Sequence, residues 1–124
     1  MKKVLFSLGI LLLISCKNEN KENFIKSNTK ATPDKVSGKE LFENKGNCIA
    51  CHQTEQKVIG PSLSEIATTY KAKKQSIVLF LKEESDPIID PSQYDIMKAN
   101  FAITKSMSDD ELKAIEDYIY TFSK

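Results

Sequence analysis

The sequence predicts an all-α fold. Serines stand at three places where a helix N-cap is expected, and each is followed three residues later by a glutamate, as in a capping box: Ser37, Ser62 and Ser108. After the last of these serines, apolar residues follow at helical spacing: Leu112, Ile115, Tyr118, Ile119 and Phe122. The string Cys48-Ile49-Ala50-Cys51-His52 places two thiols on one side of a helical turn, and its flanks show no strand-like alternation.

The Cys-x-x-Cys-His string predicts covalent attachment of a haem. Cys48 and Cys51 can each form a thioether with one porphyrin vinyl group, and His52, the only histidine in the sequence, then lies beside the iron. The alternatives are a chance Cys-x-x-Cys pair followed by an unrelated histidine, a thioredoxin-like redox pair and half of a zinc site. A zinc site needs about four ligands, and the sequence has no second Cys/His pair. A thioredoxin motif lies in a strand–helix context, which the flanks lack.

Composition fits one small domain with a cofactor in its core. The 124 residues are 40% hydrophobic, contain no tryptophan and carry a formal charge of +1. A core built from this chain alone would be modest, and a buried porphyrin would add a large apolar surface to it. All 18 positive residues are lysines. The near-neutral balance does not indicate a nucleic-acid partner.

Residues 1–15 predict a lipoprotein signal peptide. Lys2 and Lys3 precede an apolar run, Val4 to Ile14, that is too short for a membrane span of about 20 residues. The run ends in Leu13-Ile14-Ser15-Cys16, which resembles the bacterial lipobox, so we expect Cys16 to be lipidated. An ordinary signal peptide and an unmodified leader cysteine are the alternatives. With Cys16 lipidated, no thiol remains for a disulfide, and the mature protein is expected on the periplasmic side, anchored by lipid.

Residues 16–34 predict a flexible tether and residues 35–124 the folded domain. The tether is rich in lysine, asparagine, glutamate and threonine, and Phe24 and Ile25 are its only large apolar residues. In the domain, Ser37 opens a helix that runs toward Asn47 and delivers Cys48.

The middle of the domain predicts two more helices and a loop. After a turn at Gly60-Pro61, a helix follows the Ser62 cap. The lysines after it are either a solvated surface or part of a docking patch: Lys71, Lys73 and Lys74. A second helix is expected over about residues 74–84, and the Asp-Pro pairs at 86–87 and 90–91 then predict a loop.

A methionine is expected as the sixth ligand of the iron. The single histidine excludes bis-histidine ligation within one chain, and the predicted mature chain offers Met97 and Met107. Met107 directly precedes the Ser108 cap and is expected to pack there. Met97 lies in the predicted Pro-bounded loop and is preferred as the ligand. Gap-filling in the core is the alternative for either methionine.

Taken in order, these pieces resemble a class I, monohaem bacterial cytochrome c over about residues 36–122. The resemblance is carried by the Cys-x-x-Cys-His string, Gly38-x-x-Leu41-Phe42, Gly60-Pro61-x-Leu63, a later methionine and the capped last helix. It implies three to five helices around one covalent haem c, with the N- and C-terminal helices crossing so that Gly38 and Phe42 meet the Tyr118 side. It also implies that the Pro61 carbonyl accepts a hydrogen bond from the His52 ring. Unlike many members, the sequence has Lys98 rather than proline after Met97.

One-electron transfer between respiratory redox proteins is the function these features favour, with no catalytic residues and no small-molecule substrate. A haem-based ligand sensor is the main competing hypothesis, and it would require Met97 to be absent or labile. A haem-free thiol oxidoreductase would instead keep free, reactive thiols at Cys48 and Cys51. A small cytochrome subunit of a larger respiratory enzyme would share the haem site, and the sequence does not separate such a subunit from a mobile carrier.

Overall fold

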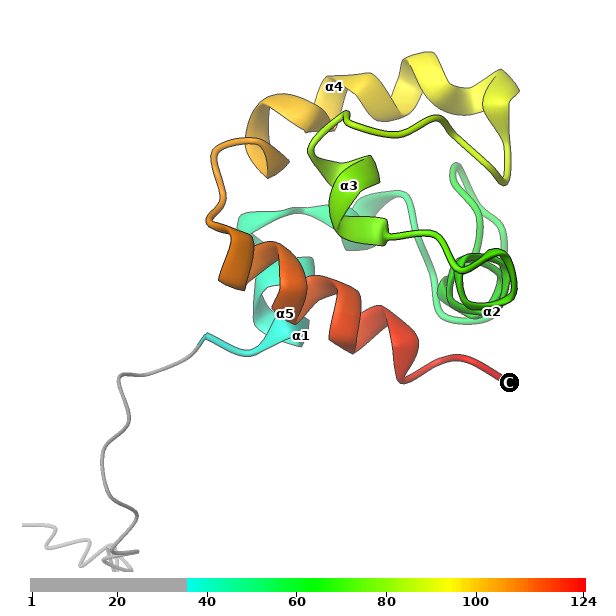
Figure 1. The fold of residues 1–124 in the computed structure, drawn as a ribbon, viewed down its shortest axis with the longest axis horizontal. Helices are drawn as coiled ribbons and strands as arrows, with labels where there is room; N and C mark the ends of the chain where they lie inside the picture. The colour runs from blue at the N-terminus through cyan, green and yellow to red at the C-terminus, as the bar shows by residue number, and fades with distance from the viewer. Residues whose placement is uncertain (1–35) are drawn as a thin grey trace, which may run out of the picture. The chain divides into compact units, whose positions relative to one another are not determined.

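The computed structural model describes residues 36–124, which form helices and loops without a β-strand (Figure 1). The predicted signal peptide (1–15), the tether (16–34) with the lipidation of Cys16, and residue 35 lie outside the described residues. The helical segments are, in order, α1 (Gly38–Glu40), a π-helical turn (Leu41–Lys45), a 3-10 turn (Cys48–Ala50), α2 (Leu63–Lys73), α3 (Ile77–Leu81), a 3-10 turn (Pro91–Gln93), α4 (Tyr94–Thr104) and α5 (Asp109–Tyr120). Within residues 36–124, no helix has the length and apolarity needed to cross a bilayer.

The three predicted N-caps are confirmed. The Ser37 hydroxyl accepts from the Glu40 amide at 3.2 Å, and the Ser62 hydroxyl accepts from the Glu65 amide at 3.1 Å. Ser108 forms a complete capping box, because its amide also donates to the Glu111 carboxylate at 2.9 Å. These caps satisfy amide donors that a helix start otherwise leaves unpaired, so each helix begins where the sequence predicts.

The helix expected over residues 74–84 is shorter than predicted. Lys74 and Glu83 adopt left-handed backbone conformations, with φ of 53° and 62°, and these bound α3 to Ile77–Leu81. The first turn of α3 is capped from α5, where the buried Glu116 carboxylate accepts from the Ile77 amide at 2.9 Å. A capping group from a distant helix cannot be seen in the local pattern.

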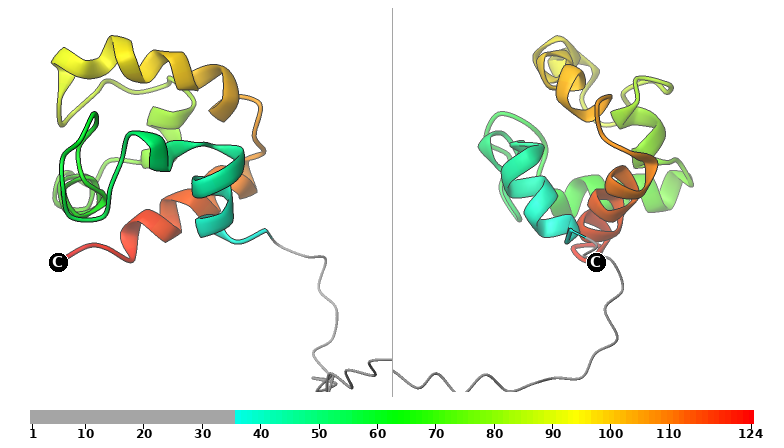
Figure 2. Two further views of the ribbon diagram at one scale, coloured as in Figure 1. Left: turned by 180° about the vertical axis from the view of Figure 1, so that it is seen from behind. Right: turned by 90° about the vertical axis from the view of Figure 1, so that its left-hand side faces the viewer.

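The first and last helices cross, as the resemblance implies (Figures 1 and 2). Gly38 makes the close approach possible, since a Cβ there would lie 2.6 Å from the Ala114 carbonyl carbon and 2.9 Å from the Tyr118 Cβ. The Phe42 and Tyr118 rings pack with centroids 5.5 Å apart. An ion pair of 2.5 Å between Lys45 and Glu111 joins the same two segments.

The prediction that Met97 lies in a loop is wrong, because it lies on helix α4. Pro91 opens a 3-10 turn that runs directly into α4, and proline is tolerated at a helix start. Both views in Figure 2 place α4 across the molecule from α1 and α5. An aromatic cluster makes part of its contact with the rest of the domain: the Phe101 ring lies 5.5 Å from that of Phe80 on α3 and 5.8 Å from that of Tyr94 at the start of α4, centroid to centroid.

Candidate functional site

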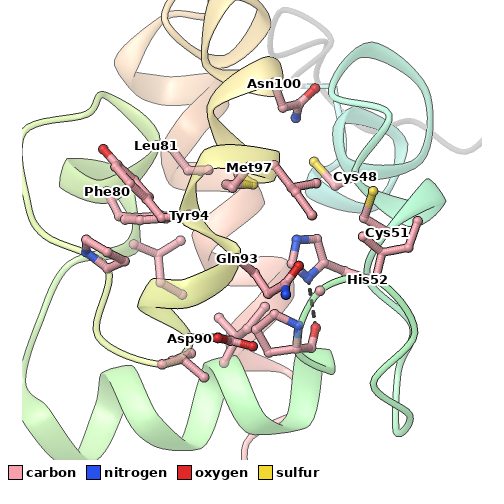
Figure 3. Close-up of a pocket in the computed structure, with 18 of the residues that line it drawn as sticks. Cys48, Cys51, His52, Phe80, Leu81, Asp90, Gln93, Tyr94, Met97 and Asn100 are labelled. Carbon is pink, nitrogen blue, oxygen red and sulfur yellow. Dashed lines mark hydrogen bonds between the residues drawn. The ribbon is translucent and has the colours of Figure 1, made fainter.

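A cavity of about 370 Å³ lies between the Cys-x-x-Cys-His segment and α4 (Figure 3). This volume is within the roughly 300–1,000 Å³ typical of cofactor pockets. Most of its lining is apolar and comes from helical segments throughout the domain. The principal apolar residues of the wall are Phe42, Ile66, Ile77, Phe80, Leu81, Ile88, Ile115 and Ile119. Such a wall favours a large apolar ligand.

The two cysteines lie on one tight turn at the cavity wall. Asn47 adopts a left-handed conformation with φ of 49° and turns the chain out of the π-helical segment. The Cys48 carbonyl then accepts from the Cys51 amide at 3.1 Å and from the His52 amide at 3.0 Å. Both sulfurs and the imidazole therefore face one cavity (Figure 3). The thiols differ, because Cys48 is buried, which raises its pKa to about 11, whereas Cys51 is half-buried.

The imidazole of His52 is fixed by two neighbours in the following loop. Its Nδ1 lies 2.8 Å from the Pro61 carbonyl oxygen, as the resemblance implies, and a nitrogen facing a carbonyl must be the donor. Gly60 packs closely against the ring, since a Cβ there would clash with Cε1 and come 2.7 Å from Nδ1. Burial lowers the pKa of His52, an effect that the Pro61 hydrogen bond partly opposes. The ring is therefore neutral at pH 7 and keeps an unprotonated Nε2, the form that binds a metal.

The opposite wall comes from α4. Met97 lines the cavity there, together with Asn100, whose side-chain amide donates to the Gly46 carbonyl at 3.0 Å. Met107 is 7% exposed, packs in the hydrophobic core and is not part of the lining. The structure thus brings Met97 to the cavity that holds Cys48, Cys51 and His52, and leaves Met107 outside it.

Several polar lining residues were missed from the sequence. Asp90 lies at the cavity edge, where its carboxylate pairs with Lys57 at 2.5 Å and accepts from the Ser92 hydroxyl at 2.6 Å. The hydrogen bond from the Lys57 ammonium lowers the pKa of Asp90, so the carboxylate is charged at neutral pH.

A sequence signal for α4 was also present. Its residues Tyr94, Met97, Phe101 and Thr104 follow one another at spacings of three, four and three, and that helical pattern could have predicted α4.

The residues present fit a covalently bound haem. Two thiols on one tight turn, a neutral imidazole beside them and a thioether across the cavity are a donor set that suits haem c. Gly60 packs closely against the His52 side chain, where any larger residue would displace the ring. Among residues 36–124, no group of three or more His, Cys, Asp or Glu side chains could hold a bare metal ion.

Comparison with known proteins agrees with this geometry. Residues 36–123 match the family model "Cytochrome c". The chain is 62% identical over 29 residues to "Cytochrome c-552" of Nitrosomonas europaea, covering 23% of this chain and 28% of that protein. It is 37% identical over 41 residues to "Cytochrome c-551" of Pseudomonas denitrificans, covering 33% and 49%. These matches span less than half the length of either relative. With the family model matched along nearly the whole described region, the chain belongs to the cytochrome c family, whose cofactor is a covalently attached haem c.

Proposed function

We propose that this chain is a monohaem electron carrier that works outside the cytoplasmic membrane. In this proposal Cys48 and Cys51 attach the haem, and His52 and Met97 are the two axial ligands. The observation that carries it is the pairing of opposite walls, with the cysteines and imidazole on one side of a single cavity and the Met97 thioether on the other (Figure 3).

Each wall has its own task in this proposal. Pro61 holds the His52 ring in one tautomer at 2.8 Å, so Nε2 remains the only ring nitrogen free to bind iron. The Met97 sulfur favours ferrous iron and so raises the reduction potential. When bound, the haem supplies an iron that alternates between the ferrous and ferric states. The apolar side chains of the wall exclude water, which keeps the reorganisation that accompanies each electron small.

Within residues 36–124, the cavity offers no arrangement for acid–base or nucleophilic catalysis. Asp90 is held in an ion pair with Lys57. His52 and the two cysteines are assigned to the cofactor. We therefore infer a carrier rather than an enzyme, with respiratory redox proteins as donor and acceptor. A subunit of a larger respiratory complex would use the same residues, and co-purification distinguishes it from a mobile carrier.

The lipid anchor is part of the proposal and has its own test. Lipidation of Cys16 would hold the domain at the membrane surface, with residues 16–34 as the tether. A Cys16→Ser variant should move the haem protein from the membrane fraction to the soluble periplasmic fraction. Equal membrane retention of both forms would exclude the anchor and leave the haem site unaffected.

The deciding experiment is an absorption spectrum of the mature haem protein with Met97→Ala and Met107→Ala. The wild type should be six-coordinate and low-spin, with a far-red sulfur-to-iron band. Met97→Ala should lose that band and bind carbon monoxide readily, whereas Met107→Ala should keep the band despite a loss of stability of about 2–5 kcal/mol. A wild-type protein that is high-spin and binds carbon monoxide would support the ligand-sensor hypothesis. Loss of the band in Met107→Ala alone would reassign the ligand.

A further inference from the structure

Two lysines converge on one short segment at the cavity edge. Lys57, in the loop after His52, pairs with the Asp90 carboxylate at 2.5 Å. Lys73, at the end of α2, donates to the Ile88 carbonyl at 3.1 Å. Residues 88–90 all line the cavity. Two cations from separate elements therefore lie against the same three-residue stretch of the wall.

Among the described residues, the lining of the cavity contains a negative charge and no positive charge of its own, so the two lysines beside it are the nearby cations for an anionic ligand. In the part of the chain that the structure describes, Asp90 is the only Asp or Glu of the lining, and no lysine lines the cavity directly. The sequence contains no arginine. A haem brings two propionate carboxylates, and carboxylates placed near Asp90 would repel it unless cations stand between them. Lys57 and Lys73 each place an ammonium group against residues 88–90.

The attachment chemistry indicates which end of the cavity receives the propionates. On a porphyrin of the haem c type, the vinyl-derived carbons lie on one half of the ring and the propionates on the other. Thioethers to Cys48 and Cys51 therefore direct the propionates away from the cysteines. In Figure 3, Asp90 lies at the end of the cavity away from Cys48. That end carries the two lysines.

We propose that Lys57 and Lys73 form a cationic clamp for the two haem propionates, with Asp90 holding Lys57 in position. This inference rests on the proposed function, because it requires the haem to be attached at Cys48 and Cys51. Both ammonium groups are exposed and carried on flexible stems, so they can donate to a propionate while keeping their present partners.

The clamp has a measurable consequence for the reduction potential. Ferric haem carries one more positive charge than ferrous haem, so nearby cations disfavour the oxidised state. Removing Lys57 or Lys73 should therefore lower the midpoint potential. Removing the negative charge of Asp90 should raise it. The signs are opposite although the Lys57 and Asp90 changes break the same ion pair.

The test measures midpoint potentials of the mature haem protein by redox titration at one fixed pH, at low and high salt. The variants are Lys57→Gln, Lys73→Gln, Asp90→Asn and Lys57→Arg. The matched control is Lys124→Gln, which also removes an exposed, ion-paired lysine, 2.7 Å from Glu55, but whose partner does not line the cavity. We expect both glutamine variants at the clamp to lower the potential more than the control does, and high salt to shrink the difference. Lys57→Arg should stay close to wild type.

The outcomes separate the clamp from a merely structural role. If Lys57 only fixes the loop through its ion pair, Lys57→Gln and Asp90→Asn should shift the potential in the same direction, and that result would overturn the clamp. Shifts at Lys57 and Lys73 no larger than that of Lys124→Gln would also overturn it. Failure of the proposed function is distinct, because it would appear as absent haem or a missing sulfur band in the unmutated protein.

Discussion

The two walls of the cavity are built in different ways. The histidine wall is local, because Cys48, His52, Gly60 and Pro61 lie in one short stretch and contact one another directly. The methionine wall is a separate helix, α4, whose polar ties reach residues far away in the sequence. Those ties are Asn100 to Gly46 at 3.0 Å, Thr104 to Leu81 at 2.6 Å and Lys105 to Glu83 at 2.7 Å.

This difference implies that the two proposed axial ligands, His52 and Met97, are not held equally firmly. Local packing, and in the proposed function covalent attachment, hold the histidine wall, whereas α4 depends on a few long-range contacts. Only Phe101 and Thr104 of α4 are buried. Segments with few buried contacts open at lower free energy than the rest of a domain. We therefore expect α4 to detach before the histidine wall is disturbed.

The largest expected effect is that of Phe101→Ala, which removes the main apolar anchor of α4. Phe101 is 2% exposed and packs on Phe80 and Tyr94. Loss of a buried phenylalanine costs about 3–5 kcal/mol. Denaturant unfolding should show this loss, and the sulfur-to-iron band should disappear while the haem stays attached. Ile103→Ala, on the exposed side of the same helix at 38% exposure, should cost under about 1 kcal/mol. Equal costs for the two variants would contradict the role of this anchor.

Gly60→Ala tests the histidine wall. The added methyl group would lie 2.7 Å from Nδ1 of His52 and compete with the Pro61 hydrogen bond. Overpacking of this kind costs about 1–3 kcal/mol. The yield of haem-loaded protein and the unfolding midpoint should both fall. Val58→Ala, at an exposed position of the same loop, is the control. A Gly60→Ala protein with wild-type yield and midpoint would mean that the ring can shift without cost.

Thr104→Val removes one polar tie of α4 without changing its shape much. The hydroxyl is fully buried and donates to the Leu81 carbonyl at 2.6 Å. A buried acceptor left unpaired costs about 1–3 kcal/mol. In thermal melts the sulfur-to-iron band should disappear at a lower temperature than in wild type, ahead of the loss of helix measured by circular dichroism. Ser106→Ala removes an exposed hydroxyl nearby and should leave the two transitions as in wild type. If both signals still vanish together in Thr104→Val, α4 does not open separately.

Glu111→Gln has the smallest expected effect and concerns neither wall. The side-chain hydrogen bond from Lys45, and the one from the Ser108 amide, lower the pKa of Glu111 below its ordinary 4.5. A carboxyl whose pKa is lower in the folded state stabilises the fold above its unfolded pKa, and this stabilisation is lost as the pH falls through the folded value. The variant should therefore be less stable than wild type at pH 7, and chemical unfolding of both proteins across a pH series should show them converging in acid. A difference that persists in strong acid, with the carboxyl fully protonated, would not arise from this ionisation.

The histidine wall was predictable from sequence because its contacts are local. The Cys48-to-His52 spacing, the Gly60-Pro61 turn and the three serine caps each act within a few residues, and the structure shows the caps and the Pro61 contact. The methionine wall was only partly predictable. The Asp90-Pro91 pair predicted a loop. Gln93, the N-cap residue of α4, makes no side-chain capping hydrogen bond, so the sequence carries no capping signal for the start of this helix. The Lys57–Asp90 pair and the Glu116 contact to α3 join distant segments, so no local pattern reveals them.

Placing Met97 on a helix rather than in a loop affects how its proposed bond to iron would break. A sulfur in an irregular segment can swing away through a few backbone torsions, independently of its neighbours. A sulfur on α4 is released either by its own side-chain rotation or by departure of the whole helix. If the second route is the faster one, entry of an external molecule such as carbon monoxide should proceed at the same rate as deuterium uptake by the amides of residues 98–104. Equal rates of carbon monoxide entry and deuterium uptake would show that opening of α4 limits access to the sixth coordination position of the iron.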